Sequence, residues 1–265
     1  MSAHRQNIVK LFRSMGYRHD AYRLFADFCE LAALSLANAV DLAQREAREA
    51  RYLEIVKGYT REEIELFPRV LAEVTLGLEE GATDLLGAVF HDLELHNKYQ
   101  GQFFTPFEVC KMMASMTIGS EAQLRSLVEQ RGYVTACEPA CGAGAMVIAL
   151  AEGIRELGIN YQRHLHVTAV DVDRKAAHMA YIQFSLLHIP AVVVVGNSLT
   201  LEEREHWYTP AHILGGWTGK LQRARAAQTI EIEAMPAPAM AAMSAAVELP
   251  SAMRKAAAVG QLALF

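Results

Sequence analysis

A glycine-rich turn between a strand and a helix constrains the fold of this chain more than any other feature. Residues 134–138 are small or β-capable and end in Glu138, which Pro139 follows. Gly142 and Gly144, with one alanine between them, then open into an apolar run with the character of a helix. Because glycine has no Cβ and adopts positive φ, a ligand can lie against the bare backbone of such a turn. A tight β-α turn that binds nothing is the alternative interpretation.

Two further strands with polar ends favour the ligand-binding interpretation. Residues 165–170 lead into Asp171, at about the spacing at which an acid holds ribose hydroxyls in a nucleotide-binding βαβ unit. We assign that role to Asp171 and keep Asp173 as a second choice. Residues 191–195 include four consecutive valines, as expected of a strand buried on both faces. The pattern predicts an α/β fold with parallel strands.

Two motifs then resemble a known family. Residues 138–144 read Glu-Pro-Ala-Cys-Gly-Ala-Gly, and residues 101–106 read Gly-Gln-Phe-Phe-Thr-Pro. The first resembles the cofactor loop of adenine-specific (N-6) DNA methyltransferases, and the second resembles the segment that closes over the methionine end of their S-adenosylmethionine. Both stand in the family's order, and they look most like the modification subunits of type I restriction systems. The resemblance covers roughly residues 97–200 and implies a partial Rossmann-like methyltransferase sheet with S-adenosylmethionine as its cofactor.

The resemblance also implies which residues hold the cofactor. The family frequently has an acid near position 197, where Asn197 would offer an uncharged carbonyl to the adenine amino group. Ordinary hydrophobic anchoring is the alternative role for Phe103 and Phe104. The implied cofactor-binding set is Gln102, Phe103, Phe104, Thr105, Pro106, Glu138, Pro139, Ala140, Gly142, Ala143, Gly144, Asp171 and Asn197.

The half of the site that would hold the methyl acceptor is not recognisable. Members of the family carry an Asn/Asp-Pro-Pro-aromatic motif that accepts hydrogen bonds from the target amino group and stacks on the flipped base. No such tetrapeptide occurs in this sequence. The nearest segment, 206–212, has aromatic residues and one proline, and we interpret it as a turn that packs Trp207 and Tyr208 against the sheet edge. Catalytic residues are therefore not assigned.

The composition of successive segments predicts three regions. Residues 1–96 have apolar positions at helical spacing and a capping-box pattern at Thr60, which predict a helical N-terminal region. Residues 97–219 contain the cofactor-binding domain, which is incomplete because the family's seven-stranded sheet needs more strands; a partner chain could supply them. Residues 220–265 are rich in Ala, Met and Pro and predict a flexible tail.

Charge and cysteine content limit the partners. The chain has 265 residues, 52% of them hydrophobic, and its net charge of −5 argues against a broadly basic nucleic-acid surface. We therefore expect DNA contact to be local or to come through a partner such as a specificity subunit. The four cysteines show neither a disulfide framework nor a zinc pattern, and no apolar run is long enough to span a membrane. We expect a cytoplasmic protein without a metal site.

The C-terminal residues resemble a peptide by which bacterial proteins bind the replication sliding clamp. Gln261 would form a hydrogen bond at the rim of the clamp pocket, while Leu262, Leu264 and Phe265 would fill its apolar cleft. A flexible tail ending in such a peptide would hold the folded part near DNA. A frayed apolar terminus and a tail that folds back onto the core are the alternatives.

Three functions follow from these motifs. The first is an adenine-specific DNA methyltransferase, completed by a partner that supplies strands and DNA contacts. The second is an accessory protein of DNA metabolism that keeps the cofactor fold without transferring methyl groups. The third, a small-molecule methyltransferase, is disfavoured because the 101–106 motif is typical of the DNA-modifying branch.

Overall fold

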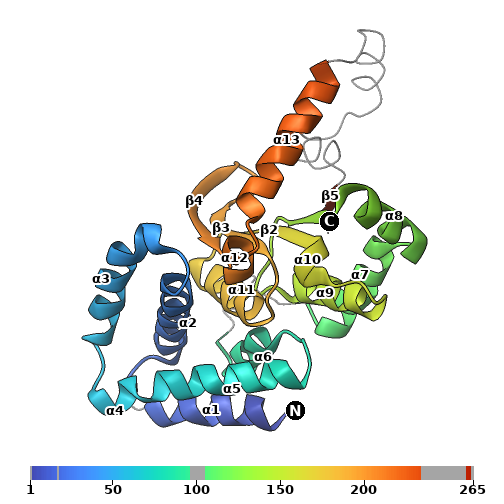
Figure 1. The fold of residues 1–265 in the computed structure, drawn as a ribbon. Coiled ribbons are helices and arrows are strands. Elements are labelled where there is room, and N and C mark those ends of the chain that lie inside the picture. The colour runs from blue at the N-terminus through green and yellow to red at the C-terminus, as the bar shows by residue number, and fades with distance from the viewer. Residues whose placement is uncertain (1, 17, 96–104, 234–260, 264–265) are drawn as a thin grey trace.

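The computed structural model describes residues 2–16, 18–95, 105–233 and 261–263. Helices of the N-terminal region lie on one side of a small sheet, and the later helices lie around the rest of it (Figure 1). The N-terminal helices are α1 (Ala3–Met15), α2 (Ala21–Asn38), α3 (Arg45–Val56), α4 (Arg61–Ile64), α5 (Leu66–Glu80) and α6 (Leu85–Asp92), with the short 3-10 helix η1 (Leu42–Gln44) before α3. The expected helical N-terminal region is confirmed.

Local sequence explains where these helices begin. Thr60 accepts a hydrogen bond from the Glu63 backbone N–H, and the Glu63 side chain accepts one from the Thr60 N–H, so the predicted capping box is present. Pro68 lies in the first turn of α5, where a backbone N–H has no partner to lose. The helix therefore tolerates this proline.

The sheet has the strand order β4-β3-β2-β1-β5. Its strands are β1 (Val134–Glu138), β2 (Leu165–Asp171), β3 (Ala191–Asn197), β4 (Glu202–Tyr208) and β5 (Gln261–Ala263). The pairs β1–β2, β2–β3 and β1–β5 are parallel, whereas β4 runs antiparallel to β3. The α/β class with a mainly parallel sheet is confirmed, and the three predicted strands lie within one residue or two of their expected bounds.

The remaining helices connect and cover these strands. They are α7 (Phe107–Ile118), α8 (Glu121–Arg131), α9 (Ala145–Glu156), α10 (Tyr161–His164), α11 (Arg174–Leu186), α12 (Pro210–Leu214) and α13 (Trp217–Glu233). Helix α9 connects β1 to β2 and α11 connects β2 to β3, two steps in the same direction across the sheet. Because such crossovers are right-handed, α9 and α11 cover the same face.

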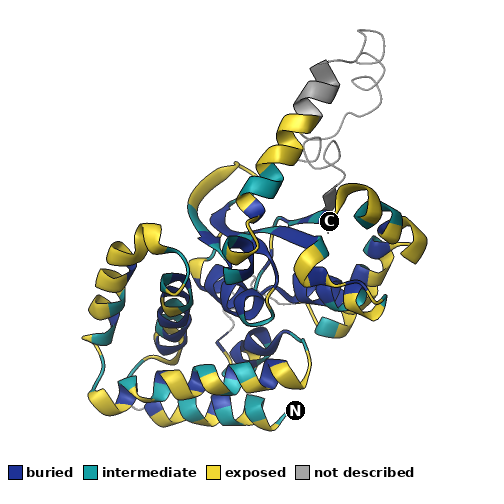
Figure 2. Ribbon diagram, viewed as in Figure 1, coloured by how far each residue is buried: buried dark blue, intermediate teal, exposed yellow. Residues whose placement is uncertain are grey.

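Helix α11 is the centre of the molecule. Every residue from Lys175 to Ser185 is buried, and the helix packs against β2 and β3 on one side and against α2 on the other. Figure 2 shows this continuous burial where the N-terminal helices meet the sheet. One hydrophobic core therefore runs through both regions, so the residues before and after the expected boundary at 96 do not have separate cores.

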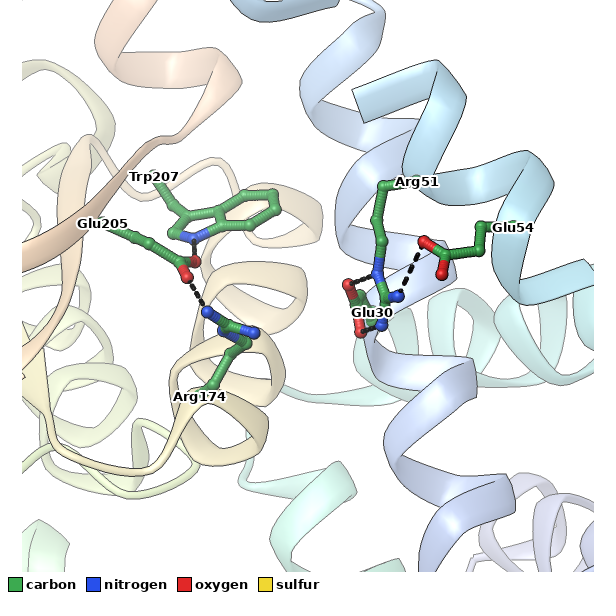
Figure 3. A network of polar contacts seen from close by, with 6 residues as sticks. All are labelled: Glu30, Arg51, Glu54, Arg174, Glu205 and Trp207. Atoms are coloured by element: carbon green, nitrogen blue, oxygen red, sulfur yellow. Dashed lines mark hydrogen bonds and ion pairs between the residues drawn. The ribbon is translucent and has the colours of Figure 1, made fainter. Parts of the chain in front are cut away.

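Polar contacts lie at both sides of this junction (Figure 3). Arg51 of α3 bonds Glu30 of α2, with 2.6 Å between Nε and Oε1. Arg174 of α11 pairs with Glu205 of β4, and the other Glu205 oxygen accepts a hydrogen bond of 3.1 Å from the Trp207 indole. These contacts tie α3 to α2 and β4 to α11 at the surface of the shared core.

Two expectations need correction. The tail predicted from residue 220 begins instead inside helix α13, which continues to Glu233. The helix extends this far because Leu, Gln, Arg and Ala are good helix formers and the first proline after residue 220 is at 236. The segment around Trp207 and Tyr208 was expected to be a turn, but it is the end of strand β4. Trp207 is buried, but its ring lies 4.7 Å from that of His178 on α11 and not against the sheet edge.

Within the described residues, no helix has the length and apolar character needed to cross a membrane.

Candidate functional site

The polar residues predicted at three strand ends lie along one edge of the sheet. Glu138 is the last residue of β1, Asp171 of β2 and Asn197 of β3. Because these strands are parallel neighbours, their carboxyl ends meet at this edge. The loop after β1 closes onto β2, since the Cys141 backbone N–H donates a 2.8 Å hydrogen bond to the Val170 carbonyl.

The glycine loop has the conformation that its sequence predicts. Gly142 and Gly144 have φ values of 54° and 97°, both in the region that favours glycine. A Cβ on Gly144 would also lie 2.5 Å from the Phe184 ring of α11. The loop therefore lies tightly on α11, and Gly144 is the residue from which α9 starts.

Glu138 is the most unusual group of this edge. Its side chain is buried, with 1% of the residue exposed, and Oε1 accepts a 3.1 Å hydrogen bond from the Ala140 N–H. Oε2 is also buried but has no hydrogen-bond partner. Burial raises the pKa of Glu138 to about 7, the nearby charge of Asp171 acts in the same direction, and the Ala140 N–H opposes them. A buried carboxylate oxygen without a partner is costly unless a ligand satisfies it.

Asp171 and Asp173 have different roles in the described structure. Asp171 accepts hydrogen bonds from the Gly142 N–H, at 2.8 Å, and from the Asp173 N–H, at 2.9 Å. Burial is the main cause that raises the pKa of Asp171, while both backbone donors act against it. Asp173 instead caps α11 by accepting from the Lys175 N–H. Asp171 is thus the acid that faces the glycine loop.

Asn197 is already engaged in a turn. Its Oδ1 accepts from the Leu199 N–H at 2.9 Å and from the Thr200 N–H at 3.3 Å. An amide oxygen has two lone pairs, so both are used here. The side-chain NH₂ group, rather than the carbonyl expected from the sequence, is the part of Asn197 that remains for a ligand.

The upstream motif is described only in part. Gln102, Phe103 and Phe104 lie outside the described residues, whereas Thr105 and Pro106 lead into α7. The Thr105 carbonyl lies 3.8 Å from the Cys110 sulfur. Burial, with smaller contributions from the charges of Asp84 and Glu138, raises the pKa of Cys110 to about 11. The first turn of α7 therefore lies within electrostatic reach of Glu138.

The other residues predicted for the glycine loop are brought together. Pro139, Ala140 and Ala143 lie in the loop between β1 and α9.

The predicted C-terminal peptide is described only in part. Gln261–Ala263 form strand β5 beside β1, with Gln261 opposite Thr135. Leu264 and Phe265 lie outside the described residues.

Two residues at the site were not found from the sequence. Gln183 of α11 donates a hydrogen bond to the Ala143 carbonyl of the glycine loop and another to Asp84, the residue that caps α6. An aspartate before an apolar helical run is a recognisable N-cap signal. Nothing in the sequence indicates that it also bonds a glutamine 99 positions away.

Two pockets of the described structure lie away from the glycine loop. One of about 530 Å³ has Arg163, His188 and Lys220 in its lining, and one of about 270 Å³ includes Arg125 and His164. Both lie beside α10, at the amino ends of the strands and thus opposite to the glycine loop. Among the described residues, no group of three or more His, Cys, Asp or Glu is placed to hold a metal ion.

Comparison with known proteins finds one family model that matches part of the chain. Residues 83–214 match the family model described as N-6 DNA Methylase. No curated protein matches the sequence. Among solved structures, a protein of Listeria monocytogenes assigned to the class I S-adenosylmethionine-dependent methyltransferases has a TM-score of 0.41 and 13% sequence identity to this chain. The similarity covers 74% of this chain and 54% of that one, so the chain spans about half of the length of the solved protein.

Proposed function

Residues 83–214 belong to the N-6 DNA methylase family, and from this premise we propose that the chain binds S-adenosylmethionine at the carboxyl edge of β1 and β2 and contributes the methyl-donor side of a DNA adenine methyltransferase. The single observation that carries the proposal is the buried Glu138 Oε2 without a hydrogen-bond partner, next to a glycine loop in the required conformation. A cationic group of a ligand would supply the hydrogen-bond donor that this oxygen lacks.

Each polar group of the edge has a role in this proposal. Glu138 pairs with the ammonium of the methionine part, which favours the ionised carboxylate and offsets the cost of its burial. Asp171, which faces the same loop, accepts hydrogen bonds from the ribose hydroxyls. The Asn197 NH₂ group donates to a ring nitrogen of the adenine. The 101–106 segment covers the methionine end.

The chemistry of the proposed reaction is transfer of a methyl group from a sulfonium. The bound cofactor supplies an electrophilic methyl group; the adenine amino nitrogen forms the new N–C bond, the C–S bond breaks, and the amino group releases a proton to solvent. The residues of this chain hold the donor and fix its direction, which is where catalysis by positioning arises. Because no Asn/Asp-Pro-Pro-aromatic tetrapeptide occurs, we propose that a partner chain, such as a specificity subunit of a restriction-modification system, helps to hold DNA.

Isothermal titration of the full chain with S-adenosylmethionine and with S-adenosylhomocysteine tests the cofactor proposal. We expect saturable binding of both, because they share the ammonium, ribose and adenine groups. Gln130→Met, on the exposed side of α8 and away from the glycine loop, should bind both ligands with the wild-type affinity. Absence of heat with both ligands, for a protein whose circular dichroism shows it folded, would overturn the proposal.

Incubation of the full chain with tritiated cofactor and DNA of mixed sequence tests the transfer step. We expect slow or no incorporation by the chain alone, because the acceptor motif is absent, and incorporation once the partner is added. Efficient turnover by the chain alone that Asp171→Ala abolishes would show that an acceptor site exists in it. Binding without transfer under all conditions would select the accessory, non-catalytic function.

A sliding clamp remains a proposed partner. The backbone of Gln261–Ala263 pairs with β1 over three residues, so the peptide would have to leave β1 before it could fill a clamp pocket. Fluorescence anisotropy of a peptide ending at Phe265 against purified clamp tests this partner. Equal weak binding by the wild-type peptide and by one with Leu264→Ala and Phe265→Ala would exclude it.

A further inference from the structure

The backbone of the glycine loop is hydrogen-bonded to Gln183, a residue that lies outside the loop. Gln183 is fully buried in α11, at 0% exposure. Its Nε2 donates to the Ala143 carbonyl at 2.8 Å and to Asp84 Oδ1 at 3.0 Å, and its Oε1 accepts from the Leu86 N–H at 3.1 Å. Both amide protons and the carbonyl are thus used, which fixes the orientation of the amide.

Asp84 is held as firmly as Gln183. It caps α6, with Oδ1 accepting a 2.9 Å hydrogen bond from the Gly87 N–H. A Cβ at Gly87 would collide with this carboxylate, so the first turn of α6 has room for it only because residue 87 is glycine. Burial raises the pKa of Asp84, while the Gln183 amide and the Gly87 N–H favour its charged form. The two hydrogen bonds therefore give Gln183 an acceptor, Asp84 Oδ1, whose position the helix cap fixes.

The loop also lies against α11 at Gly144, the residue after Ala143. Gly144 lies against Phe184, the neighbour of Gln183, and the Cβ of Ala180 lies one turn away at 3.4 Å from where a Gly144 Cβ would be. Displacement of Gln183 would leave the Ala143 carbonyl buried without this donor, and a buried acceptor without a partner shifts to find one.

Helix α6 also has a fixed position on the N-terminal helices. Arg5 of α1 forms two 2.6 Å hydrogen bonds with the Asp92 carboxylate and a 3.2 Å bond with the Ala88 carbonyl. The chain that leaves α6 continues to the 101–106 motif. Helix α6 thus connects, at its beginning, to the glycine loop and, after its end, to the other predicted cofactor segment.

We propose that Gln183, oriented by Asp84, is a positioning residue for the cofactor loop: it holds the Ala143 carbonyl so that the loop keeps its ligand-binding shape, without touching the ligand. Through Asp84, the N-terminal helices set the shape of a site formed more than fifty residues later in the chain. The part of this inference that concerns cofactor affinity rests on the proposed function; the part that concerns loop conformation does not.

Two substitutions of Asp84 distinguish its hydrogen bond with Gln183 from its role as the N-cap of α6. Asp84→Asn keeps a side-chain oxygen that can accept from both Gly87 and Gln183. Asp84→Ser keeps a good N-cap for α6 but is too short to reach Gln183. Gln183→Met fills a similar volume and removes all three bonds of the amide.

Hydrogen–deuterium exchange of the full chain without ligand is the primary measurement. We expect exchange in the 140–147 peptide to rise about tenfold in Asp84→Ser and more in Gln183→Met, since a lost hydrogen bond to a charged or buried group changes a local opening equilibrium by about that factor. The β3 peptide, 191–197, should exchange as in the wild type, and Asp84→Asn should match the wild type throughout. The β3 peptide also reports global unfolding, and if Gln183→Met unfolds, the Ser and Asn pair decides the question.

Cofactor titration of the same variants gives the second readout. We expect Asp84→Ser to weaken affinity about tenfold and Asp84→Asn to leave it unchanged. Wild-type exchange of the 140–147 peptide in Asp84→Ser would overturn the positioning role, whatever the affinity. Raised exchange together with no cofactor binding by the wild type would support the positioning role and reject the proposed function.

Discussion

At the scale of single residues, the site contains a buried carboxyl group that destabilises the ligand-free protein when it is ionised. Glu138 has its pKa raised from 4.5 to about 7 by burial. Since the folded form holds its proton more tightly than the unfolded chain, the stability that protonated Glu138 contributes is complete below pH 4.5 and is lost as the pH rises through 7. Above pH 7 the ionised carboxylate costs the ligand-free protein about 3 kcal/mol.

Glu138→Gln tests this balance. The substitution removes the buried charge but keeps an oxygen for the Ala140 N–H, so we expect the ligand-free variant to be more stable than the wild type at pH 8 by roughly 1–3 kcal/mol. The difference should shrink toward pH 5, and the affinity for S-adenosylmethionine should fall at least about tenfold at pH 8. Urea unfolding at the two pH values and calorimetric titration measure these quantities. Lower stability at pH 8 would contradict the raised pKa.

Asp171→Ala tests the second acid. We expect the loss of charged hydrogen bonds to weaken cofactor binding by about 1.5–3 kcal/mol, roughly ten- to a hundredfold. Asp173→Asn is the control, since asparagine can still cap α11, and it should bind the cofactor as the wild type does. Equal losses in both variants would mean that the effect passes through α11 and not through the ribose.

Gly142→Val tests the glycine loop by the same titration. We expect it to abolish binding, because a β-branched residue strongly disfavours positive φ.

At the scale of elements, α11 packs against both the sheet and helix α2, and its sequence alone does not indicate this. His178 lies on its β4 side, and Nε2 is buried with no hydrogen-bond partner. Burial lowers the pKa of His178 from 6.5 to about 4. The unfolded chain therefore binds the proton more tightly than the folded one, and stability falls as the pH drops from 6.5 toward 4.

His178→Phe should reduce this acid sensitivity. Phenylalanine keeps an aromatic ring against Trp207 and has no proton to bind. We expect the wild type to lose about 1 kcal/mol or more relative to the variant between pH 7 and pH 5. Thermal unfolding followed across that range measures the difference. Parallel curves for the two proteins would show that His178 does not carry the effect.

The same helix shows where sequence reasoning succeeds and stops. Strand patterns, the capping box and the glycine loop are local, so short-range preference predicts them. Strand β4 was missed because its exposed face is Glu- and Arg-rich, and because its one buried residue, Trp207, packs on His178 of α11, which is distant in the sequence. Gln183 was missed because its partners, Asp84 and Ala143, are far away in the sequence, and a buried amide has no periodic signature.

At the scale of the whole molecule, the N-terminal helices and the sheet form one unit. Arg48 of α3 is 6% exposed, pairs with Asp41 at 2.8 Å and lies 5.2 Å from the centre of the Trp207 ring of β4. Arg174, which pairs with Glu205, is much more exposed, at 59% of its side chain. The two arginines therefore make the same kind of contact in very different surroundings.

Replacing each arginine by alanine compares the two. We expect Arg48→Ala to lower the free energy of unfolding by about 3 kcal/mol, because Asp41 is left largely buried without its partner and the packing on Trp207 is lost. Arg174→Ala should cost less than about 1 kcal/mol, as exposed ion pairs do. Urea unfolding monitored by Trp fluorescence measures both. Equal losses would mean that α3 is not held on β4 by Arg48.

The burial of α2 against α11 also has a consequence for biosynthesis. About 135 residues separate the end of α2 from the start of α11. At roughly 5–20 residues per second, the ribosome therefore completes α2 some 7–27 s before the synthesis of α11 begins. During that interval the face of α2 that packs against α11 lacks this partner, although Phe25 and Phe28 can already pack against Phe12 of α1. A ribosome stalled before residue 174 would thus display an apolar helix face of the kind that nascent-chain chaperones hold, until α11 is released to cover it.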